Sequence, residues 1–521
     1  MPFLREFEAF LTPIFFLLVI SIFSHSLRRS MSAYPLPPGP RRLPLLGNAH
    51  QLPSEFQHKT FKQWAAKYGD IFYLEVFRKP AIVISSARIA HDLMEKRSSK
   101  YSDRPRTVVF TELMGLEPTA SILPYGNRWR LHRRWLQTAF QTKTAQRDYQ
   151  PLQRRRIRQL LSALLDTPED FRTLIKKSAG GTMMEVTYGH IATAADDGFI
   201  EWADDIITRM QEAGSAGTTI TDFFPILKYV PEWMPGAGIK RRVSGLRSEV
   251  QQLHDVPYER VKSAVDAGSA RTSFLASLIE KISADNELTQ DDVFNLKGVA
   301  GVVYIAGVDT TVTVVVTFIL AMVLHPEVYK KAQAEVDRVI GQSRLPDFDD
   351  RPSMPYLDCV LKETYRWGCP LPLVVPHQVI QDDEYLGYHI PAGSMIIPNV
   401  WAMTRNPDVY PDPDTFIPER FENLDDGTAS QLNPSELIFG FGRRICPGRT
   451  FADTTIWLLI ASVLATMDIC KTCDEAGEKI TPEPIFKHGN VCHPVPFKCD
   501  IRPRSEEAVG VIKLANAEGS S

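Results

Sequence analysis

The chain has 521 residues, a formal net charge of −3, 44% hydrophobic residues and 23% charged residues, which is the composition of an ordinary globular protein. This charge balance gives no general affinity for nucleic acid, so we expect no nucleic-acid partner. The seven cysteines are odd in number in a long chain, which argues against a secreted disulfide framework.

The N-terminus carries a membrane signal. Residues 10–23 read FLTPIFFLLVISIF without a charge, and residues 7–27 together reach about the length that crosses a bilayer. No clear small-residue cleavage site follows, so an uncleaved anchor is favoured over a signal peptide. Arg28 and Arg29 come next, and the positive-inside tendency then places the rest of the chain in the cytosol. We predict a transmembrane anchor over residues 1–27.

Three further segments follow the anchor. Residues 28–44 include YPLPPGP, whose prolines make a stiff extended linker. We place one globular domain over residues 45–502. The remaining residues, 503–521, are small and polar, and we expect them to form a loose tail.

Helical periodicity dominates the globular domain. Strand-like alternation appears at 70–77 and 81–85, which predicts a hairpin, and again within 384–398. Helices are predicted at residues 55–68, 127–140, 326–340, 356–367 and 451–467. The sequence therefore predicts a mainly α domain with a small β region.

The helix predicted at 127–140 is strongly basic. It carries Arg128, Arg130 and Arg134 among apolar residues. One interpretation is a solvated basic face. The other is a docking surface for an acidic partner protein.

A long apolar helix is predicted from Thr289 to His325. Thr289 and Asp292 form a capping-box pattern, and residues 299–324 read VAGVVYIAGVDTTVTVVVTFILAMVL. Hydropathy alone allows a second membrane span, but a helix buried through a large domain is equally apolar. Asp309 with Thr310 forms a polar notch at its middle, which favours the buried helix.

Two shorter patterns precede the last helix. In LKETYRW, Glu363 and Arg366 are three residues apart and therefore share a helix face. Alone, this pair is more often solvated than buried. Arg420, in FIPERF, offers a third charge.

The stretch FGFGRRICPGRT, residues 439–450, places one cysteine among glycines and arginines. A thiolate is a strong ligand for soft metals and for haem iron. Cys446 and Pro447 precede an apolar amphipathic run, so the thiol is expected at a helix N-terminus, where an anion is stabilised. The glycines let the backbone approach a flat partner, and Arg444 suits a carboxylate.

This stretch resembles the haem-thiolate signature of the cytochrome P-450 monooxygenases. The pattern Phe439-x-x-Gly442-x-Arg444-x-Cys446-x-Gly448 matches every fixed position, and the resemblance runs from the anchor to about residue 502. It implies the P-450 fold, with a long central helix over the haem. Details after that helix resemble fungal secondary-metabolite hydroxylases.

The resemblance also implies roles for single residues. Cys446 would be the axial ligand of the haem iron, while Asp309 and Thr310 would relay protons to the dioxygen being cleaved. Thr310 is further expected to bond to the carbonyl four residues earlier. The residues implied in haem binding are Trp129, Arg133, Ala306, His377, Phe439, Arg444, Cys446 and Gly448. Glu363, Arg366 and Arg420 would form a buried cluster that supports the cysteine loop.

The implied partners follow from the reaction. The cofactor would be haem b, and NADPH would act only through a separate flavoprotein reductase, because the chain shows no nucleotide-binding motif of its own. The basic face of Arg128, Arg130 and Arg134 would dock that reductase. The enzyme would be a single-pass protein of the endoplasmic reticulum membrane with a cytosolic catalytic domain.

The substrate is expected to be a lipophilic small molecule, because the segments that the resemblance implies as pocket walls are mostly apolar. These segments are residues 108–123, 223–230, 302–306, 371–375 and 491–494. A terpenoid is favoured, with a polyketide or an alkaloid as the other possibilities. Alternative functions are a haem-thiolate isomerase or dehydratase, a hydroxylase of xenobiotics or fatty acids, and a membrane haem carrier or two-span channel. The intact Asp309–Thr310 pair argues against the isomerase.

Overall fold

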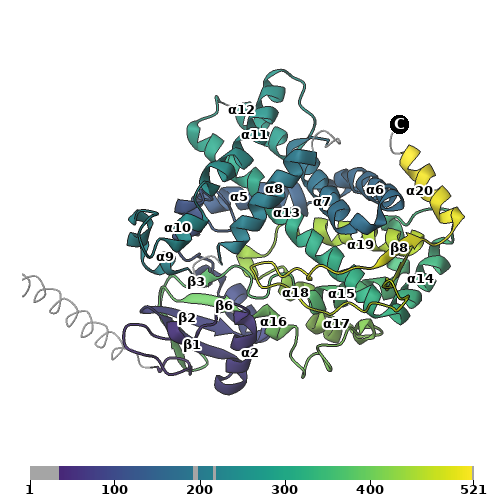
Figure 1. The fold of residues 1–521 in the computed structure, drawn as a ribbon. Coiled ribbons are helices and arrows are strands. Elements are labelled where there is room, and N and C mark those ends of the chain that lie inside the picture. Colours follow the sequence, from purple (N-terminus) through teal and green to yellow (C-terminus); the bar gives the residue numbers. More distant parts are fainter. Residues whose placement is uncertain (1–33, 192–196, 215–218, 285, 519–521) are drawn as a thin grey trace, which may run out of the picture.

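The computed structural model describes residues 34–191, 197–214, 219–284 and 286–518 (Figure 1). The anchor predicted at 1–27 lies outside the described residues. Helices make up most of the described chain, as predicted, and strands are few and short.

The helices are as follows: α2 (Gln57–Tyr68), α3 (Ala87–His91), α4 (Ser98–Tyr101), α5 (Asn127–Gln141), α6 (Lys143–Asp166), α7 (Phe171–Tyr188), α8 (Asp197–Glu212), α9 (Ile220–Phe223), α10 (Gly238–Arg242), α11 (Leu246–Asp266), α12 (Phe274–Ser283), α13 (Gln290–Leu324), α14 (Pro326–Ile340), α15 (Pro355–Gly368), α16 (Val400–Met403), α17 (Asp426–Leu432), α18 (Ser435–Ile438), α19 (Arg449–Thr466) and α20 (Glu506–Glu518). Short turns connect them, including the π turn η3 (Val108–Leu113) and the 3-10 turn η9 (Gly442–Arg444).

The strands are β1 (Ile71–Val76), β2 (Lys79–Ile84), β3 (His377–Gln378), β4 (Asp383–Tyr385), β5 (Tyr388–Ile390), β6 (Met395–Pro398), β7 (Met467–Cys470) and β8 (Asp500–Pro503). Four of them form a sheet in the order β1-β2-β6-β3, where β2 and β6 run parallel and the other pairs antiparallel. The predicted hairpin is thus confirmed as β1–β2.

The four-stranded sheet is covered on both faces. Phe72 and Leu74 pack with Phe61 of α2, whereas Ile71 and Tyr73 pack on the other face, in a cluster that includes Phe441 of the cysteine loop. Because side chains alternate along a strand, the side chains of one strand pack into two cores. The second of these cores ties the sheet to the cysteine loop.

Helix α13 runs through the middle of the helical part (Figure 1). Thr289 and Asp292 form the predicted capping box at its start. Among the described residues it is the one helix long and apolar enough to cross a membrane, yet 72% of its most apolar window is buried inside the fold. Its apolar character is therefore accounted for by packing against α7, α11, α15 and α19.

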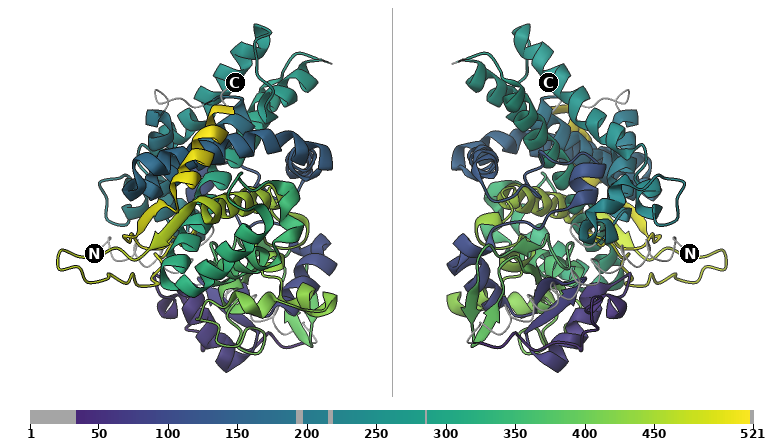
Figure 2. Two further views of the ribbon diagram at one scale, coloured as in Figure 1. Left: turned by 90° about the vertical axis from the view of Figure 1, so that its right-hand side faces the viewer. Right: turned by 90° about the vertical axis from the view of Figure 1, so that its left-hand side faces the viewer.

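The C-terminal segment differs from the prediction of a loose tail. Residues 506–518 form α20, which packs on α6 and α19 at the outer surface of the molecule (Figure 2). Ile512 is fully buried there, and Ala508 and Ala515 are buried beside it. Their spacing gives the helix an apolar stripe, and the burial of that stripe holds the segment in place.

Candidate active site

The cysteine loop is a tight turn that leads into α19. Gly440 and Gly442 have φ angles of 79° and 56°, in the left-handed region that favours glycine. A Cβ at Gly442 would also come within 1.9 Å of the Met94 carbonyl oxygen. The backbone N–H of Cys446 donates to the Phe439 carbonyl at 2.8 Å, which closes the turn. The glycines of the motif therefore shape this loop.

Cys446 lies two residues before Gly448, the N-cap of α19. Burial raises the pKa of its thiol. The backbone N–H groups of Gly448 and Arg449, together with the charges of Arg133 and Arg449, act in the opposite direction and favour the thiolate. The predicted position at a helix N-terminus is confirmed, and it prepares the sulfur to carry negative charge.

Three largely buried guanidinium groups surround the cysteine loop. They belong to Arg104, Arg133 and Arg444, and burial lowers the pKa of each, that of Arg444 to about 10. Within the described part of the chain, none of the three has a carboxylate within 4.0 Å. A buried cation without an anion is costly, so this cluster is suited to bind one.

Backbone carbonyls hold these guanidinium groups in place. Arg444 donates to the carbonyls of Ser102 and Leu123 at 2.8 Å each, and Arg133 donates to that of Ile445. The Arg444 guanidinium also lies 4.6 Å from the ring centroid of Trp129, which is buried. The structure thus brings three predicted site residues together at the cysteine loop.

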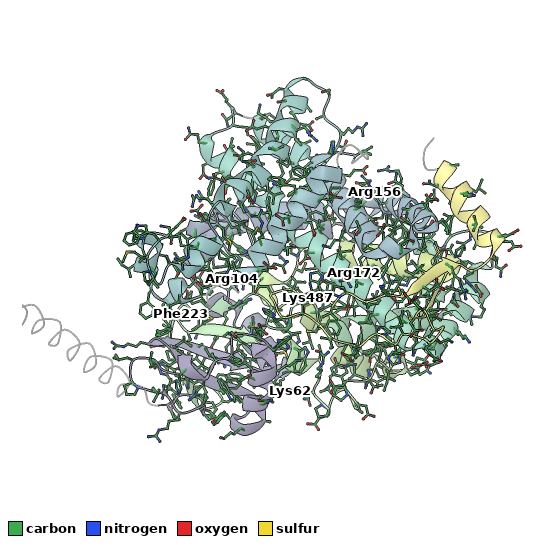
Figure 3. The ribbon with its side chains drawn as sticks, in the orientation of Figure 1. Lys62, Arg104, Arg156, Arg172, Phe223 and Lys487 are labelled. Atoms are coloured by element: carbon green, nitrogen blue, oxygen red, sulfur yellow. The ribbon has the colours of Figure 1, made fainter. Side chains whose placement is uncertain are left out.

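Arg104 was not predicted from the sequence. It donates to the carbonyls of Ser121, Val375 and Pro376 at 2.9, 2.6 and 2.8 Å, at the border between the sheet and the helices (Figure 3). Its sequence context, Asp-Arg-Pro, resembles an exposed turn. Only the fold brings it beside Arg444.

His377 is buried on β3, next to the same cations. Burial lowers the pKa of its imidazole well below the usual range, and Arg104 adds to the effect. The ring is therefore neutral, and Nδ1 donates to the Tyr101 carbonyl at 2.7 Å. This bond fixes the orientation of the ring.

The polar notch of α13 lies next to an exposed residue of the helix. Ala306 is exposed although most of the surrounding helix is buried. The Thr310 hydroxyl donates to the Ala306 carbonyl at 2.7 Å, so the predicted bond to the carbonyl four residues earlier is confirmed. That carbonyl therefore accepts a hydrogen bond from a side chain in addition to the one from the helix backbone.

Asp309 lies in the same notch but turns to other partners. Its Oδ1 lies 2.9 Å from His493 Nε2, and its Oδ2 accepts a hydrogen bond from Gln211 of α8. Among the described hydrogen bonds, none joins the side chains of Asp309 and Thr310. Sequence reasoning missed both partners, because each lies far from Asp309 in the chain.

Glu363, Arg366 and Arg420 form the predicted buried cluster. The Glu363 carboxylate accepts two bonds from Arg366, at 2.6 and 2.7 Å, and lies 3.3 Å from Arg420 Nε. Glu363 and Arg366 are both fully buried. Tyr365, the residue before Arg366 on α15, meets the ring of Phe439 edge-on, so this helix also contacts the cysteine loop.

The comparison with known sequences identifies the family. The family model of cytochrome P450 matches residues 37–499. The chain belongs to the cytochrome P450 family. It is 48% identical to cytochrome P450 monooxygenase 176 of Postia placenta over 95% of both chains. It is also 37% identical to cytochrome P450 monooxygenase ple1 of Rhodocybe pseudopiperita, over 92% of this chain and 91% of the relative.

The chain is accordingly a cytochrome P450 monooxygenase of the kind found in fungi, and the family implies a haem with a cysteine thiolate ligand. The residues of the site fit this group. Buried cations without carboxylate partners suit the propionates of a haem, a thiol at a helix N-terminus suits its iron, and Ala306 leaves room beside α13.

Some of the arginines on α5 and in the cysteine loop form an ion pair, and others do not. Arg130 and Arg134 of α5 are exposed, while Arg128 pairs with Asp291. Arg443 and Arg449 of the cysteine loop are also exposed. Within the described chain, Arg130, Arg134, Arg443 and Arg449 have no carboxylate within 4.0 Å. They form what we call the proximal basic face.

Apolar side chains from three segments are only half-buried. They are Phe110 and Leu113 of η3, Val302, Val303 and Ile305 of α13, and Leu371, Leu373, Val374 and Val375 before β3. A bond of 2.9 Å from the Cys492 N–H to the Pro370 carbonyl ties the C-terminal segment to the last group. All of these half-buried residues lie in the stretches predicted to line a substrate pocket.

Proposed function

We propose that this P450 inserts one oxygen atom of dioxygen into a C–H or C=C bond of a lipophilic small molecule and reduces the other atom to water. One observation carries the proposal. A largely buried thiol at the N-terminus of α19 lies among largely buried guanidinium groups that have no carboxylate partner in the described chain.

The chain's own residues would hold the haem as follows. Cys446 would ligate the iron, and Arg133, Arg444, Trp129, His377 and the newly found Arg104 would bind the propionates. Ala306, Phe439 and Gly448 would flank the ring, and the cluster of Glu363, Arg366 and Arg420 would stabilise the cysteine loop. When bound, the haem would supply the iron at which dioxygen is cleaved, and its thiolate ligand would donate the electron density that favours cleavage of the O–O bond.

Asp309 and Thr310 would manage the protons of the reaction. The Thr310 hydroxyl donates to the Ala306 carbonyl, and a bond of this kind weakens the backbone hydrogen bonding of the helix turn beside the exposed Ala306. Asp309 is held ionised by His493 and Gln211, so it can accept a proton from outside and pass it inward. Relay of protons by this pair is the role that the notch supports best.

The substrate is proposed to be a secondary metabolite, with a terpenoid as the first class to test and polyketides and alkaloids next. The half-buried apolar side chains of η3, α13 and residues 371–375 support a lipophilic ligand. An optical titration distinguishes the classes, because a ligand that displaces water from ferric haem changes its spin state.

Electrons are proposed to come from NADPH through a separate flavoprotein reductase. The proximal basic face, Arg130, Arg134, Arg443 and Arg449, suits an acidic partner and lies near the cysteine loop. Arg128 contributes less charge than predicted, because Asp291 pairs with it.

The enzyme is proposed to sit on the endoplasmic reticulum membrane through the anchor at 1–27. Leu43 of the linker and Leu45 and Leu46 directly after it are exposed, as are Ile226, Tyr229 and Trp233 after α9. The Pro38 carbonyl accepts a bond from Tyr73 of β1, and Phe224 meets Phe77 after β1, so the linker and the α9 segment both flank the hairpin. This apolar side is suited to a lipid surface. Proteolysis of sealed vesicles should leave only the N-terminal span protected.

The test of the proposed function uses full-length protein in microsomes. Cys446→Ala should abolish the spectrum of thiolate-ligated haem and all turnover, whereas wild type should show both, with turnover dependent on NADPH and reductase. A Cys446→Ala variant with the wild-type spectrum would refute the proposal. Turnover without NADPH would indicate an isomerase instead.

A further inference from the structure

Both oxygens of the Asp309 carboxylate are occupied by partners from outside α13. His493 Nε2 lies 2.9 Å from Oδ1, and the Gln211 amide donates to Oδ2. Burial raises the pKa of Asp309, but the hydrogen bond and charge of His493, together with Gln211 and Lys176, outweigh it and hold the pKa below its usual range. The carboxylate is therefore ionised, and the group on its Oδ1 side is an imidazole that can itself carry a proton.

Thr313 completes this network one turn further along α13. Its hydroxyl lies 2.9 Å from the Asp309 carbonyl and 2.9 Å from His493 Nδ1. A hydroxyl has one proton and can donate only one bond at a time. Whether the hydroxyl donates to the carbonyl or to Nδ1 therefore determines the protonation state of the imidazole.

Two protonation states fit the same heavy-atom positions. When Thr313 donates to the Asp309 carbonyl, Nδ1 must donate to Thr313 while Nε2 donates to the carboxylate, so His493 carries both protons and a positive charge. When the hydroxyl turns to donate to Nδ1, the ring is neutral and still donates to Asp309 through Nε2. The site can thus gain or lose one proton without moving a side chain.

We propose that His493 is a positioning residue that holds the Asp309 carboxylate and supplies it with protons during turnover. The proposal rests on the proposed function. In one step Nε2 of the imidazolium gives its proton to Oδ1 of Asp309, which leaves a neutral ring protonated at Nδ1; in the next, Asp309 passes a proton inward and Nε2 of the partly exposed ring takes one from a hydronium ion of the solvent, which leaves water. No electrons move in these steps.

The elements packed around His493 set its charge environment. Asp309 on α13 lies 2.9 Å from Nε2 of His493, and two cations of α7 lie nearby: Arg172 donates to the carbonyls of Pro494 and Val495, and Lys176 acts on the Asp309 carboxylate. Lys176 is itself paired with Asp204 of α8 at 2.7 Å, which weakens its effect. One anion and two cations thus lie around the segment that carries His493.

Backbone bonds on both sides hold the segment that carries His493. Arg172 donates to the carbonyls of Pro494 and Val495 at 3.1 and 3.2 Å, and the Lys487 N–H donates to the His493 carbonyl at 2.8 Å. Figure 3 labels Arg172, which comes from α7, and Lys487, which comes from the segment that carries His493. A ring on a segment anchored in this way keeps its distance to Asp309.

The test compares two substitutions of His493 in the full-length holoenzyme. His493→Gln keeps an N–H donor for Asp309 but cannot carry a proton, whereas His493→Ala removes both. His488→Gln is the matched control, because His488 is an exposed histidine of the same segment and has no contact with α13. Thr313→Val removes the hydroxyl that permits the two protonation states and preserves the shape of the side chain.

The first readout does not depend on turnover. The infrared difference between each protein and its Asp309→Asn derivative isolates the carboxylate band of Asp309, which is followed against pH. We expect the titration midpoint to rise by about one unit or more in His493→Ala, because a nearby cation is lost. The His488→Gln midpoint should match wild type. An unchanged midpoint in His493→Ala would overturn the proposal.

The second readout is hydrogen peroxide released per NADPH consumed, with reductase and the compound that gives the largest spin-state shift. We expect His493→Ala, His493→Gln and Thr313→Val all to raise this ratio, on the order of tenfold for the His493 variants, because a positioned proton donor is lost. If His493→Gln released no more hydrogen peroxide per NADPH than wild type, the proposal that His493 supplies protons would be wrong, because Gln keeps the hydrogen bond but cannot carry a proton. An intact spectrum of the reduced CO complex in all variants keeps this result separate from a failure of the proposed function.

Discussion

At the scale of single residues, the Thr310 hydroxyl distinguishes a proton relay from a merely apolar pocket. It is bonded to the Ala306 carbonyl at 2.7 Å and faces the open side of α13. Thr310→Ala should retain haem and substrate binding but release on the order of tenfold more hydrogen peroxide per product, because proton delivery is lost. Product and peroxide are both measured against NADPH consumed.

The control for this experiment is Thr310→Ser, which keeps a hydroxyl of the same reach. It should remain close to wild type in coupling. If Thr310→Ala were as well coupled as wild type, Thr310 would have no part in proton delivery.

The site residues differ in how far the sequence could predict them. Cys446, Arg444 and the glycines form one short motif, so their proximity follows from chain connectivity. Arg104 and His493 become neighbours of the site only through contacts between distant segments. For His493, the sole signal in the sequence was a lone histidine in the apolar stretch at 491–494. No local pattern links it to Asp309.

At the scale of elements, the pair of Glu363 and Arg366 is fully buried and joins α15 to the carbonyls of Thr404, Pro413 and Thr415. Removal of one partner leaves the other charge buried without compensation. We expect Glu363→Gln to lower the free energy of unfolding by about 3–5 kcal/mol and to reduce haem content. Urea titration and the absorbance of the haem per chain measure the two effects.

The matched control lies on the surface. Arg344 forms a two-bond pair with Asp350 but has 49% of its side chain exposed. Arg344→Ala should cost about 1 kcal/mol or less, because exposed pairs contribute little. Equal costs for the two substitutions would mean that the buried cluster does not stabilise the fold.

Helix α20 offers a second test at this scale. Ile512 is fully buried against the body of the protein, whereas Leu514, two residues on, is 63% exposed. Ile512→Ala should destabilise the protein by about 2–5 kcal/mol, because a packed side chain is lost. Leu514→Ala should change stability by about 0.5 kcal/mol or less, as surface substitutions do. Thermal unfolding of both variants compares them, and a loose tail would make both neutral.

Elements with strong local signals were predicted well. The range predicted for α14 is confirmed, because Pro326 starts it and Gly341 follows its last residue, and α13 is marked by its capping box. Helix α20 was missed. Its apolar stripe is short and made largely of small residues, and it becomes a helix because α6 and α19 bury that stripe. Tertiary packing of this kind has no local signature.

At the scale of the whole molecule, burial of neutral histidines makes folding sensitive to acid. Burial lowers the pKa of His58 and of His132 from 6.5 to about 4 each, because the charged imidazole loses its water. His254 and His377 shift in the same direction for the same reason. These four side chains come from both the sheet side and the helical core, so the effect belongs to the whole fold.

The sign of the effect follows from proton binding. Between pH 6.5 and about 4, His58 and His132 take up a proton in the unfolded chain but not in the folded one. The free energy of unfolding therefore falls as the pH falls through this window, by roughly 1.4 kcal/mol per pH unit for each such histidine at most. Above 6.5 both states are neutral, and these histidines contribute no slope.

Urea unfolding at a series of pH values measures this slope. His58→Gln should reduce it by one proton, while His50→Gln, at an exposed position, should leave it unchanged. A stability that stayed constant from pH 7 to pH 5 would show that the buried histidines are protonated in the folded protein as readily as in the unfolded chain.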